Sequence, residues 1–351
     1  MRIGGAERQL VGLASFLRDE GQDVEVLTYR DGDFYLKELE RTGLKHTRIP
    51  SDGGDFSIIK RISAHLKQSG CEVLISFLVG ANIKACIVKR LCPDVKLIVS
   101  ERNTTRFMLP NDAVRFGFYR RADAVVCNSY AQAAFLRKHT PYLRSKLHSI
   151  PNFVDTDRFS PTVRTGKDVL EVVTTAQLVH RKNALGLIRS IAAANCDRLH
   201  FDWYGDLGES RYSRRCKALV EKLGLSSRIS FHPATNGVES IYARADAFCL
   251  PSFFEGTSNS MAEAMACGLP VVCSDVSDNR LYIKPGENGL IFNPHRKQEI
   301  VSCLKRLAST PADKLGEWGL NGRHCVEEKL SKEIFVKRYL DLIKGLSGGK
   351  K

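Results

Sequence analysis

The chain has 351 residues, of which 43% are hydrophobic and 26% are charged. This composition is that of a globular protein and excludes a disordered chain, and no apolar run approaches the roughly 18 residues that a membrane-spanning helix needs. The length suits two domains of ordinary size, and the formal net charge of +14 indicates an anionic partner or surface.

The positive charge is concentrated in residues 41–150, which hold 19 Lys and Arg against 7 Asp and Glu. A phosphorylated substrate or an anionic membrane surface fits this excess, and a solvated basic surface without a partner is the alternative. We expect no nucleic-acid partner, because no nucleic-acid-binding module is recognisable. Charged residues interrupt the first twenty positions, so no signal peptide is predicted and the expected location is the cytoplasm or the inner face of the plasma membrane.

The eleven cysteines form no CxxC pair, and several stand inside apolar runs, such as Cys127, Cys249 and Cys273. This pattern predicts reduced, buried thiols and neither a disulfide framework nor a cysteine-based zinc site.

The first half of the chain alternates helix-like and strand-like segments. Apolar residues with helical spacing predict a helix over 5–20, and Gly21 ends it. The strands expected next are 23–28, 72–77, 96–100 and 124–129, with helices near 55–68, 81–91 and 130–139.

The polar, proline-containing stretch 150–162 ("IPNFVDTDRFSPT") predicts a linker. After it we expect strands over 171–178, 199–205, 228–233, 247–252, 270–275 and 289–292. The helices predicted among and after them are 183–195, 209–223, 238–244, 259–267, 296–308 and 331–346.

This alternation predicts an α/β protein made of two Rossmann-like domains, whose parallel sheets face each other across a cleft. The expected domains are residues 1–155, on which a C-terminal helix at 331–347 packs back, and residues 156–330. In such sheets ligands bind beyond the carboxyl ends of the strands, and the segment that follows the strand 247–252 meets this condition.

That segment, 253–272, reads "FFEGTSNSMAEAMACGLPVV" and contains Glu255 and Glu263 eight residues apart. Ser258 suits the N-cap of a helix, so backbone N–H groups near 258–260 are expected to attract phosphate. Glu263 can accept hydrogen bonds from ribose hydroxyls, and Glu255 from a second sugar. The alternative is that both glutamates only favour the start and the exposed face of the helix.

The segment resembles the E-x7-E signature of family 4 retaining glycosyltransferases, which have the GT-B fold. Further segments resemble that family in order along the chain: "GGAERQL" (4–10), "IPNFVDTDRFSP" (150–161), "AQLVHRKN" (176–183) and "GENGLIFNP" (286–294). The resemblance covers nearly the whole chain. It implies that 1–155 binds the acceptor and that 156–330 binds a nucleotide-sugar donor.

The resemblance also implies roles for individual residues. Glu255 contacts the donor sugar, Glu263 the ribose, and Lys182 neutralises the diphosphate leaving group. Gly4 and Gly5 let the backbone approach the diphosphate, and the remaining donor-binding residues are Gln177, Arg181, Ser258, Asn259 and Ser260. No metal and no cofactor are expected, because no Asp-x-Asp motif follows a strand.

Three features depart from the family pattern. Gln177 stands where an arginine is common, and Glu101 and Arg102 of "SERN" (100–103) stand where many members have a histidine. Glu101 is therefore a candidate general base. Compared with the family pattern, the first strand of the fold is missing before "MRIGG", and we expect this to weaken the first domain.

The resulting hypothesis is a retaining hexosyltransferase that moves a hexose or N-acetylhexosamine, from a UDP-sugar, to a glycan or lipid-linked acceptor in surface polysaccharide or glycolipid synthesis. The alternating basic and aromatic residues 115–121 suggest contact with a membrane, and a half-buried helix is the equal alternative. An inactive family member that only binds the nucleotide-sugar, and a nucleotide-sugar epimerase, are the rival functions.

Overall fold

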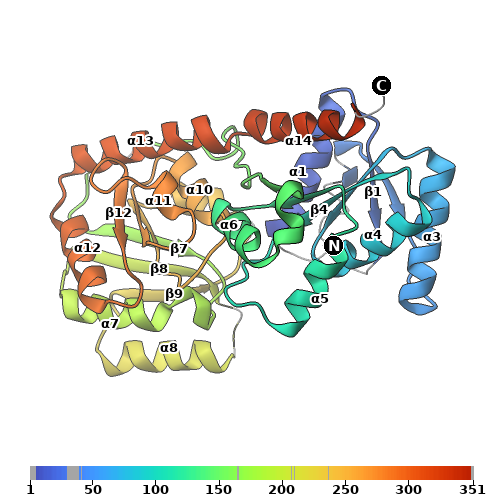
Figure 1. The fold of residues 1–351 in the computed structure, drawn as a ribbon. Coiled ribbons are helices and arrows are strands. Elements are labelled where there is room, and N and C mark those ends of the chain that lie inside the picture. Colours follow the sequence, from blue (N-terminus) through green and yellow to red (C-terminus); the bar gives the residue numbers. More distant parts are fainter. Residues whose placement is uncertain are drawn as a thin grey trace. The chain divides into compact units, whose positions relative to one another are not determined.

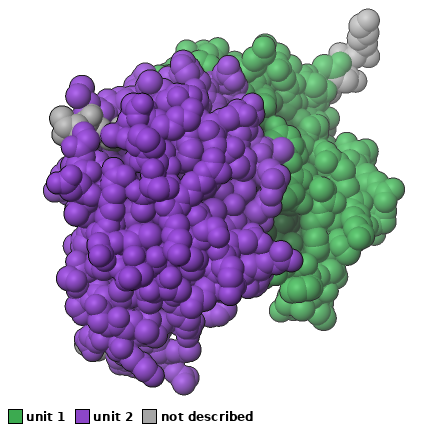
Figure 2. Space-filling view, turned by 90° about the vertical axis from the view of Figure 1, so that its left-hand side faces the viewer, with its two compact units in different colours: residues 1–153, 332–351 green, residues 154–331 purple. Residues whose placement is uncertain are grey.

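The computed structural model describes residues 5–29, 39–40, 42–163, 166–206, 208, 210–235 and 237–348. The chain divides into two compact units, residues 1–153 with 332–351 and residues 154–331 (Figure 2). Gly4 of the predicted glycine-rich loop lies outside the described residues.

The second unit is built on a parallel sheet of six strands in the order β12-β11-β10-β7-β8-β9. The strands are β7 (Leu170–Thr175), β8 (Leu199–Asp206), β9 (Ile229–Pro233), β10 (Ala247–Leu250), β11 (Val271–Ser274) and β12 (Gly289–Phe292). The order reverses between β7 and β10, because the chain builds outward from β7 to β9 and then continues on the other side of β7 at β10. Such a reversal is where open α/β sheets bind their ligands.

Helices cover both faces of this sheet, with α7 and α8 on one side and α10 and α13 on the other (Figure 1). The helical elements are η2 (His180–Lys182, a short 3-10 helix), α7 (Ala184–Ala194), α8 (Arg211–Lys222), α9 (Val238–Arg244), α10 (Asn259–Ala266), α11 (Asn279–Tyr282), α12 (Lys297–Ser309) and α13 (Ala312–Leu330). Strands β10 and β11 are buried along their whole length, as expected of parallel strands covered on both faces.

Strand β8 differs from β10 and β11, because only one of its faces is fully buried. Leu199, Phe201 and Trp203 point into the core beneath α7, whereas His200 and Asp202 on the opposite face are partly exposed. The sheet therefore has a partly open polar face on the side of β7, β8 and β9.

The first unit is also a parallel α/β structure, but its strands form two separate sheets. One sheet pairs β1 (Glu25–Thr28) with β2 (Lys45–Arg48), and the other orders β3-β4-β5-β6. The bounds of the latter four are Val73–Phe77, Lys96–Glu101, Ala124–Cys127 and Leu147–Ser149. Within the described part of the chain no strand precedes α1 or joins the two sheets, and the apolar residues Val73–Ile75 of the edge strand β3 are only half-buried.

The helical elements of the first unit are α1 (Gly5–Asp19), α3 (Gly54–Ser69), α4 (Val79–Leu91), α5 (Pro110–Tyr119), α6 (Tyr130–His139), η1 (Pro141–Lys146, a 3-10 helix) and the C-terminal α14 (Lys332–Ser347). Phe335 and Tyr339 of α14 pack in one apolar cluster with Leu13 and Leu17 of α1. The last helix thus contributes to the core of the first unit.

Helix α5 contains most of the stretch 115–121, for which the sequence left two interpretations open. Phe116 and Tyr119 are fully buried, and Arg115 is buried with a hydrogen bond to Thr105 of 2.9 Å. The structure therefore favours the half-buried helix for these residues. Three apolar side chains just outside this stretch are exposed instead, Phe107, Leu109 and Val114.

All strands expected from the apolar runs are present within a few residues of their predicted bounds, but β2 and β6 were not predicted. The sequence also gave no sign of α13, the longest helix of the second unit. Its three glycines, Gly316, Gly319 and Gly322, weaken a helical pattern. At least one of them is needed, because a Cβ on Gly319 would lie 1.9 Å from the carbonyl oxygen of Gly268.

The contact at Gly319 predicts opposite effects for two glycine substitutions in the same helix. Gly319→Ala should lower the free energy of unfolding by about 2 kcal/mol, since the methyl group meets backbone that cannot yield. Gly316→Ala meets nothing within 4 Å and should raise it by about 0.5–1 kcal/mol. Urea denaturation of both variants measures the difference, and equal effects would contradict the packing of α13 on the loop at Gly268.

Candidate active site

The residues predicted to bind a donor converge on the reversal point of the second unit's sheet. One loop follows β7 and contains η2, and the other follows β10 and leads into α10. The backbone N–H of Phe253 donates to the carbonyl oxygen of Arg181 at 2.9 Å, which ties the two loops together. Because β7 and β10 are neighbouring parallel strands, their carboxyl ends deliver both loops to the same place.

Lys182 and Glu255 form a buried ion pair across these loops. Lys182 Nζ lies 2.5 Å from Glu255 Oε1, and the side chains are 9% and 7% exposed. Ser252 Oγ donates to the same carboxylate oxygen at 2.5 Å. Burial lowers the pKa of Lys182, while the adjacent carboxylate acts in the opposite direction. A buried ammonium held in this way is an electrostatic partner for a second anion arriving at the loops.

Helix α10 begins at Asn259, four residues after Glu255, with Ser258 as its N-cap. The Ser258 side chain accepts from the backbone N–H of Met261, and its Oγ lies 3.3 Å from Ser260 Oγ. Asn259 and Ser260 form the first turn and are partly exposed. The helix therefore presents its positive end and two hydroxyl groups beside the ion pair, an arrangement that suits phosphate oxygens.

Glu263 lies one turn further along α10 and is 6% exposed. The hydroxyl group of Tyr242, on α9, lies 3.3 Å from Glu263 Oε2 and 3.4 Å from the carbonyl oxygen of Ser260, and it also contacts Thr175 at the end of β7. Tyr242 was not predicted, since a lone tyrosine in a short helix looks like any core residue. It fixes the position of the Glu263 carboxylate.

The other two donor-loop residues are exposed. Gln177 follows β7 on a loop that packs against Gly205, where a Cβ would lie 2.2 Å from the carbonyl oxygen of Ala176. Arg181 also points to solvent, whereas its neighbour Lys182 is buried. The two basic residues of η2 thus face different surroundings, and the Arg181 side chain does not join the ion pair.

A cavity of about 210 Å³ lies beside the same loops. Its lining includes His180, Arg189, Tyr212 and Arg215, together with Phe253. The sequence did not single out these arginines, because exposed basic residues are common on amphipathic helices such as α7 and α8. They extend the positive charge beyond Lys182.

Two residues of the first unit were also predicted to belong to the site, Gly5 and Glu101, and they differ in exposure. Gly5 is the first residue of α1 and is exposed. Glu101, the candidate general base, has no exposed surface, and it accepts from the Tyr119 hydroxyl at 2.9 Å and from the Asn103 N–H at 3.0 Å. Burial raises its pKa, and Arg115 lies 3.7 Å away. The carboxylate of Glu101 is thus enclosed at the end of β4 by Tyr119, Asn103 and Arg115, and its role as a general base stays a prediction.

Neither Glu255 nor Glu263 has two further potential metal ligands close by among the described residues. The described residues contain one group of three potential metal ligands: Glu171, His200 and Asp202. Their ligand atoms lie within 4.8 Å of one another. The eleven cysteines are free thiols and form no disulfide.

Two glycosyltransferase family models match the chain, one on each side of the linker. Residues 3–158 match the model described as Glycosyltransferase Family 4, and residues 170–310 match the one described as Glycosyl transferases group 1. The chain is a glycosyltransferase of the GT-B fold. The loops of Lys182 and Glu255 and the helix of Glu263 all lie within the second match.

Two curated proteins that are similar to this chain are also bacterial glycosyltransferases. The lipopolysaccharide core biosynthesis glycosyltransferase LpsE of Rhizobium meliloti is 25% identical over 97% of this chain and 96% of its own length. A Campylobacter jejuni α-1,4-N-acetyl-D-galactosaminyltransferase, whose name gives an undecaprenol diphosphate-linked glycan as its substrate, is also 25% identical, over 76% of this chain and 74% of its own.

The fold is shared with the solved structure of HepE from Anabaena in complex with UDP-glucose. It has a TM-score of 0.84 and 18% identity, and the match covers 98% of this chain and 97% of that one. No helix among the described residues of the glycosyltransferase is long and apolar enough to span a membrane.

The ion pair predicts that Glu255→Gln destabilises the fold, whatever the protein binds. Removing the carboxylate leaves the Lys182 ammonium buried without its counter-charge, which should lower the free energy of unfolding by about 3 kcal/mol. Lys182→Met in the same chain should restore much of that loss, because no charge is then buried. Denaturant unfolding of the two single variants and the double variant measures the coupling, and strictly additive effects would contradict the pair.

Proposed function

We propose that this glycosyltransferase moves a hexose or N-acetylhexosamine from a UDP-sugar to a hydroxyl group of a glycan or lipid-linked acceptor, with retention of the anomeric configuration. The observation that carries the proposal is the convergence of Lys182, Glu255, Glu263 and the start of α10 at the sheet's reversal point. A cation, a helix N-terminus and two carboxylates side by side suit a ligand that combines phosphate with sugar hydroxyls.

Each group then has a separate task at the donor. Glu263, held by Tyr242, accepts from the ribose hydroxyls, and Glu255 accepts from hydroxyls of the transferred sugar. The N-terminus of α10, with Ser258, Asn259 and Ser260, meets the diphosphate. Gly5, Gln177 and Arg181 remain proposed donor contacts, and their exposure leaves them accessible to a ligand. The UDP preference rests on the resemblance and on the UDP-sugar bound to the Anabaena protein.

The reaction breaks the bond between the anomeric carbon and the diphosphate oxygen and forms one to the acceptor oxygen. In the proposed retaining course the acceptor attacks from the face that the diphosphate leaves, and its proton passes to the diphosphate oxygen. Lys182 stabilises the negative charge that grows on the leaving group, so the protein contributes position and electrostatics. This assignment needs no protein general base and no metal at the donor, so chelation should leave transfer unchanged.

A lipid-linked acceptor is proposed from two features of the first unit. Residues 41–150 carry the excess of basic residues, and the exposed Phe107, Leu109 and Val114 lie in that range, with side chains 70%, 60% and 61% exposed. Basic charge next to exposed apolar side chains suits an anionic membrane interface. The undecaprenol-linked substrate in the name of the Campylobacter relative points the same way.

Calorimetric titration tests the donor assignment directly. UDP, GDP, ADP and UDP-sugars are titrated into the wild-type protein and into Glu263→Ala, with Glu317→Ala as the matched control. Glu317 is an exposed glutamate of α13 that pairs with Lys314, away from the proposed site. We expect UDP to bind most tightly and Glu263→Ala to weaken it at least tenfold, about 1.4 kcal/mol, while the control binds as wild type. Absence of binding by every nucleotide would refute the proposal.

A transfer assay separates an enzyme from the inactive alternative. Each UDP-sugar that binds is incubated with the protein and undecaprenyl-linked or soluble glycan acceptors, and the anomeric configuration of the product is read by NMR. Product with retained configuration supports the proposal, and inverted product contradicts retention. Nucleotide binding without turnover on any acceptor would favour the binding subunit, for which Gln177 in place of a family arginine is the specific indication.

A further inference from the structure

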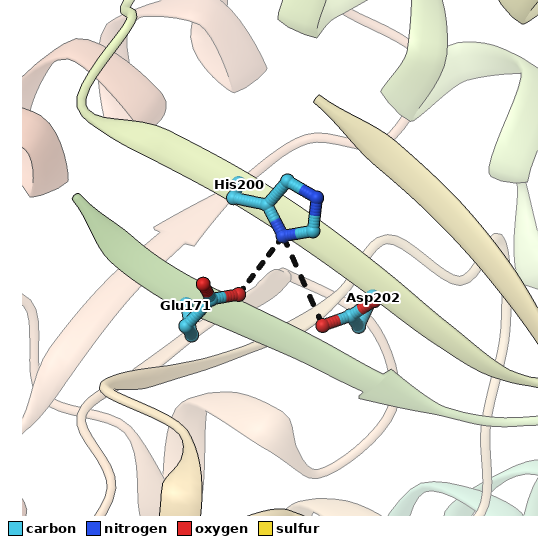
Figure 3. Close-up of side chains that lie close together, drawn as sticks. All are labelled: Glu171, His200 and Asp202. Carbon is cyan, nitrogen blue, oxygen red and sulfur yellow. Dashed lines mark hydrogen bonds and ion pairs between the residues drawn. The ribbon is translucent and has the colours of Figure 1, made fainter. Parts of the chain in front are cut away.

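A second polar cluster lies on the partly open face of the second unit's sheet, near the amino ends of its strands. Glu171 is the second residue of β7, and His200 is the second residue of β8 directly opposite it in register. Asp202 follows two residues along β8 on the same face. Figure 3 shows the three side chains standing on the sheet and pointing toward one another. The donor loops leave the other end of these strands, so the cluster is separate from the proposed active site.

The ligand atoms of the cluster converge on one point. His200 Nδ1 lies 2.9 Å from Glu171 Oε2 and 3.8 Å from Asp202 Oδ2. The side chains of Glu171, His200 and Asp202 are 38%, 26% and 20% exposed, so they are ordered by their neighbours and still reachable from solvent.

The hydrogen bonds within the protein do not satisfy all three of these side chains. His200 Nδ1 carries at most one hydrogen atom, and it can donate this to the nearer carboxylate, that of Glu171. Asp202 Oδ2 is too far from the same nitrogen to accept a hydrogen bond. Two carboxylates therefore approach one N–H. A divalent cation in place of that proton would satisfy all three atoms at once and would also neutralise both negative charges.

Neighbouring side chains orient the residues of the cluster, as they do around the ligands of known metal sites. Asp202 uses its other oxygen, Oδ1, to accept from His232 Nε2 on β9 at 2.6 Å. The His232 ring is in turn stacked on Tyr204, with the ring centroids 4.4 Å apart. Hydrogen bonds that orient a ligating carboxylate are characteristic of metal centres.

We propose that Glu171, His200 and Asp202 bind a divalent first-row transition metal ion, with Zn²⁺ the best match and a water molecule completing the coordination. Two ligand atoms at about 2.1 Å from a tetrahedral Zn²⁺ are roughly 3.4 Å apart, and the observed separations of 2.9 and 3.8 Å bracket that value. One imidazole and two carboxylates suit Zn²⁺ better than Mg²⁺ or Ca²⁺, which prefer oxygen ligands only.

The ion would act on the fold and not on the sugar chemistry. It joins β7 to β8 directly, and through Asp202 and His232 it also reaches the edge strand β9. Among the described residues, helices α7 and α8 cover one face of these strands, and the face that carries the cluster is partly exposed. Metal binding should therefore raise Tm without changing the affinity for UDP.

The experiment uses the full chain after removal of metal by EDTA and dialysis. Zn²⁺ is titrated by calorimetry and Co²⁺ by visible absorption into the wild type, His200→Gln and Asp202→Asn. The matched control is His324→Gln, because His324 pairs with a single carboxylate, Glu327, and has no third ligand. We expect one ion per chain in the wild type and in the control, and affinity at least tenfold lower in His200→Gln and Asp202→Asn.

Further measurements distinguish metal binding at this cluster from binding at cysteines and from loss of folding. The Co²⁺ complex should show no thiolate-to-metal charge-transfer band, which distinguishes this site from binding by cysteines. His232→Gln should weaken metal binding less than His200→Gln does, because His232 is not a ligand. If one of the ligand variants fails to fold, Glu171→Gln replaces it in the titration. No binding by the wild type, or equal binding by wild type, His200→Gln and Asp202→Asn, would overturn the proposal and leave a plain histidine–carboxylate network.

Discussion

The buried ion pair between Lys182 and Glu255 is the interaction on which the candidate active site depends. Its two residues are 73 positions apart in the chain, and only the reversal of strand order between β7 and β10 brings them together. Burying either charge alone costs several kcal/mol, so each residue requires the other. The pair consequently fixes the loop after β7 against the loop before α10, and the backbone bond between Phe253 and Arg181 holds the same junction.

The ion pair determines where the rest of the candidate site lies. Because Glu255 is fixed, α10 begins four residues later at a defined place, on the loop that carries the partner of Lys182. Glu263 follows one turn further on, where Tyr242 from α9 contacts its carboxylate. In the proposed reaction, the cation, the helix end and the second carboxylate would thus be arranged in advance, so little reorganisation would be needed when charge develops on a leaving diphosphate.

The sequence predicted most of the strands and the helix start at Ser258, because both depend on local signals. Apolar β-branched runs predicted the strands, and Ser258 with Glu255 and Glu263 predicted the helix start. Features that depend on tertiary contact were not predictable: α13 has a weak helical pattern and is stabilised by packing at Gly319. Glu101 shows the same limit, since the sequence places a carboxylate after a strand but does not show that Tyr119 and Arg115 enclose it.

The sheet of the second unit has two ends with different electrostatics, and this explains how one strand can serve two purposes. At the carboxyl end of β7 the loop supplies Lys182 and the surroundings are positive, with Arg189 and Arg215 lining the nearby cavity. Near the amino end Glu171 and Asp202 concentrate negative charge around one imidazole. An anion is attracted to the first end and a cation to the second. The length of the strand keeps them apart, so the proposed cation at the amino end of the sheet would stabilise the scaffold without neutralising the charge that we propose the donor diphosphate meets.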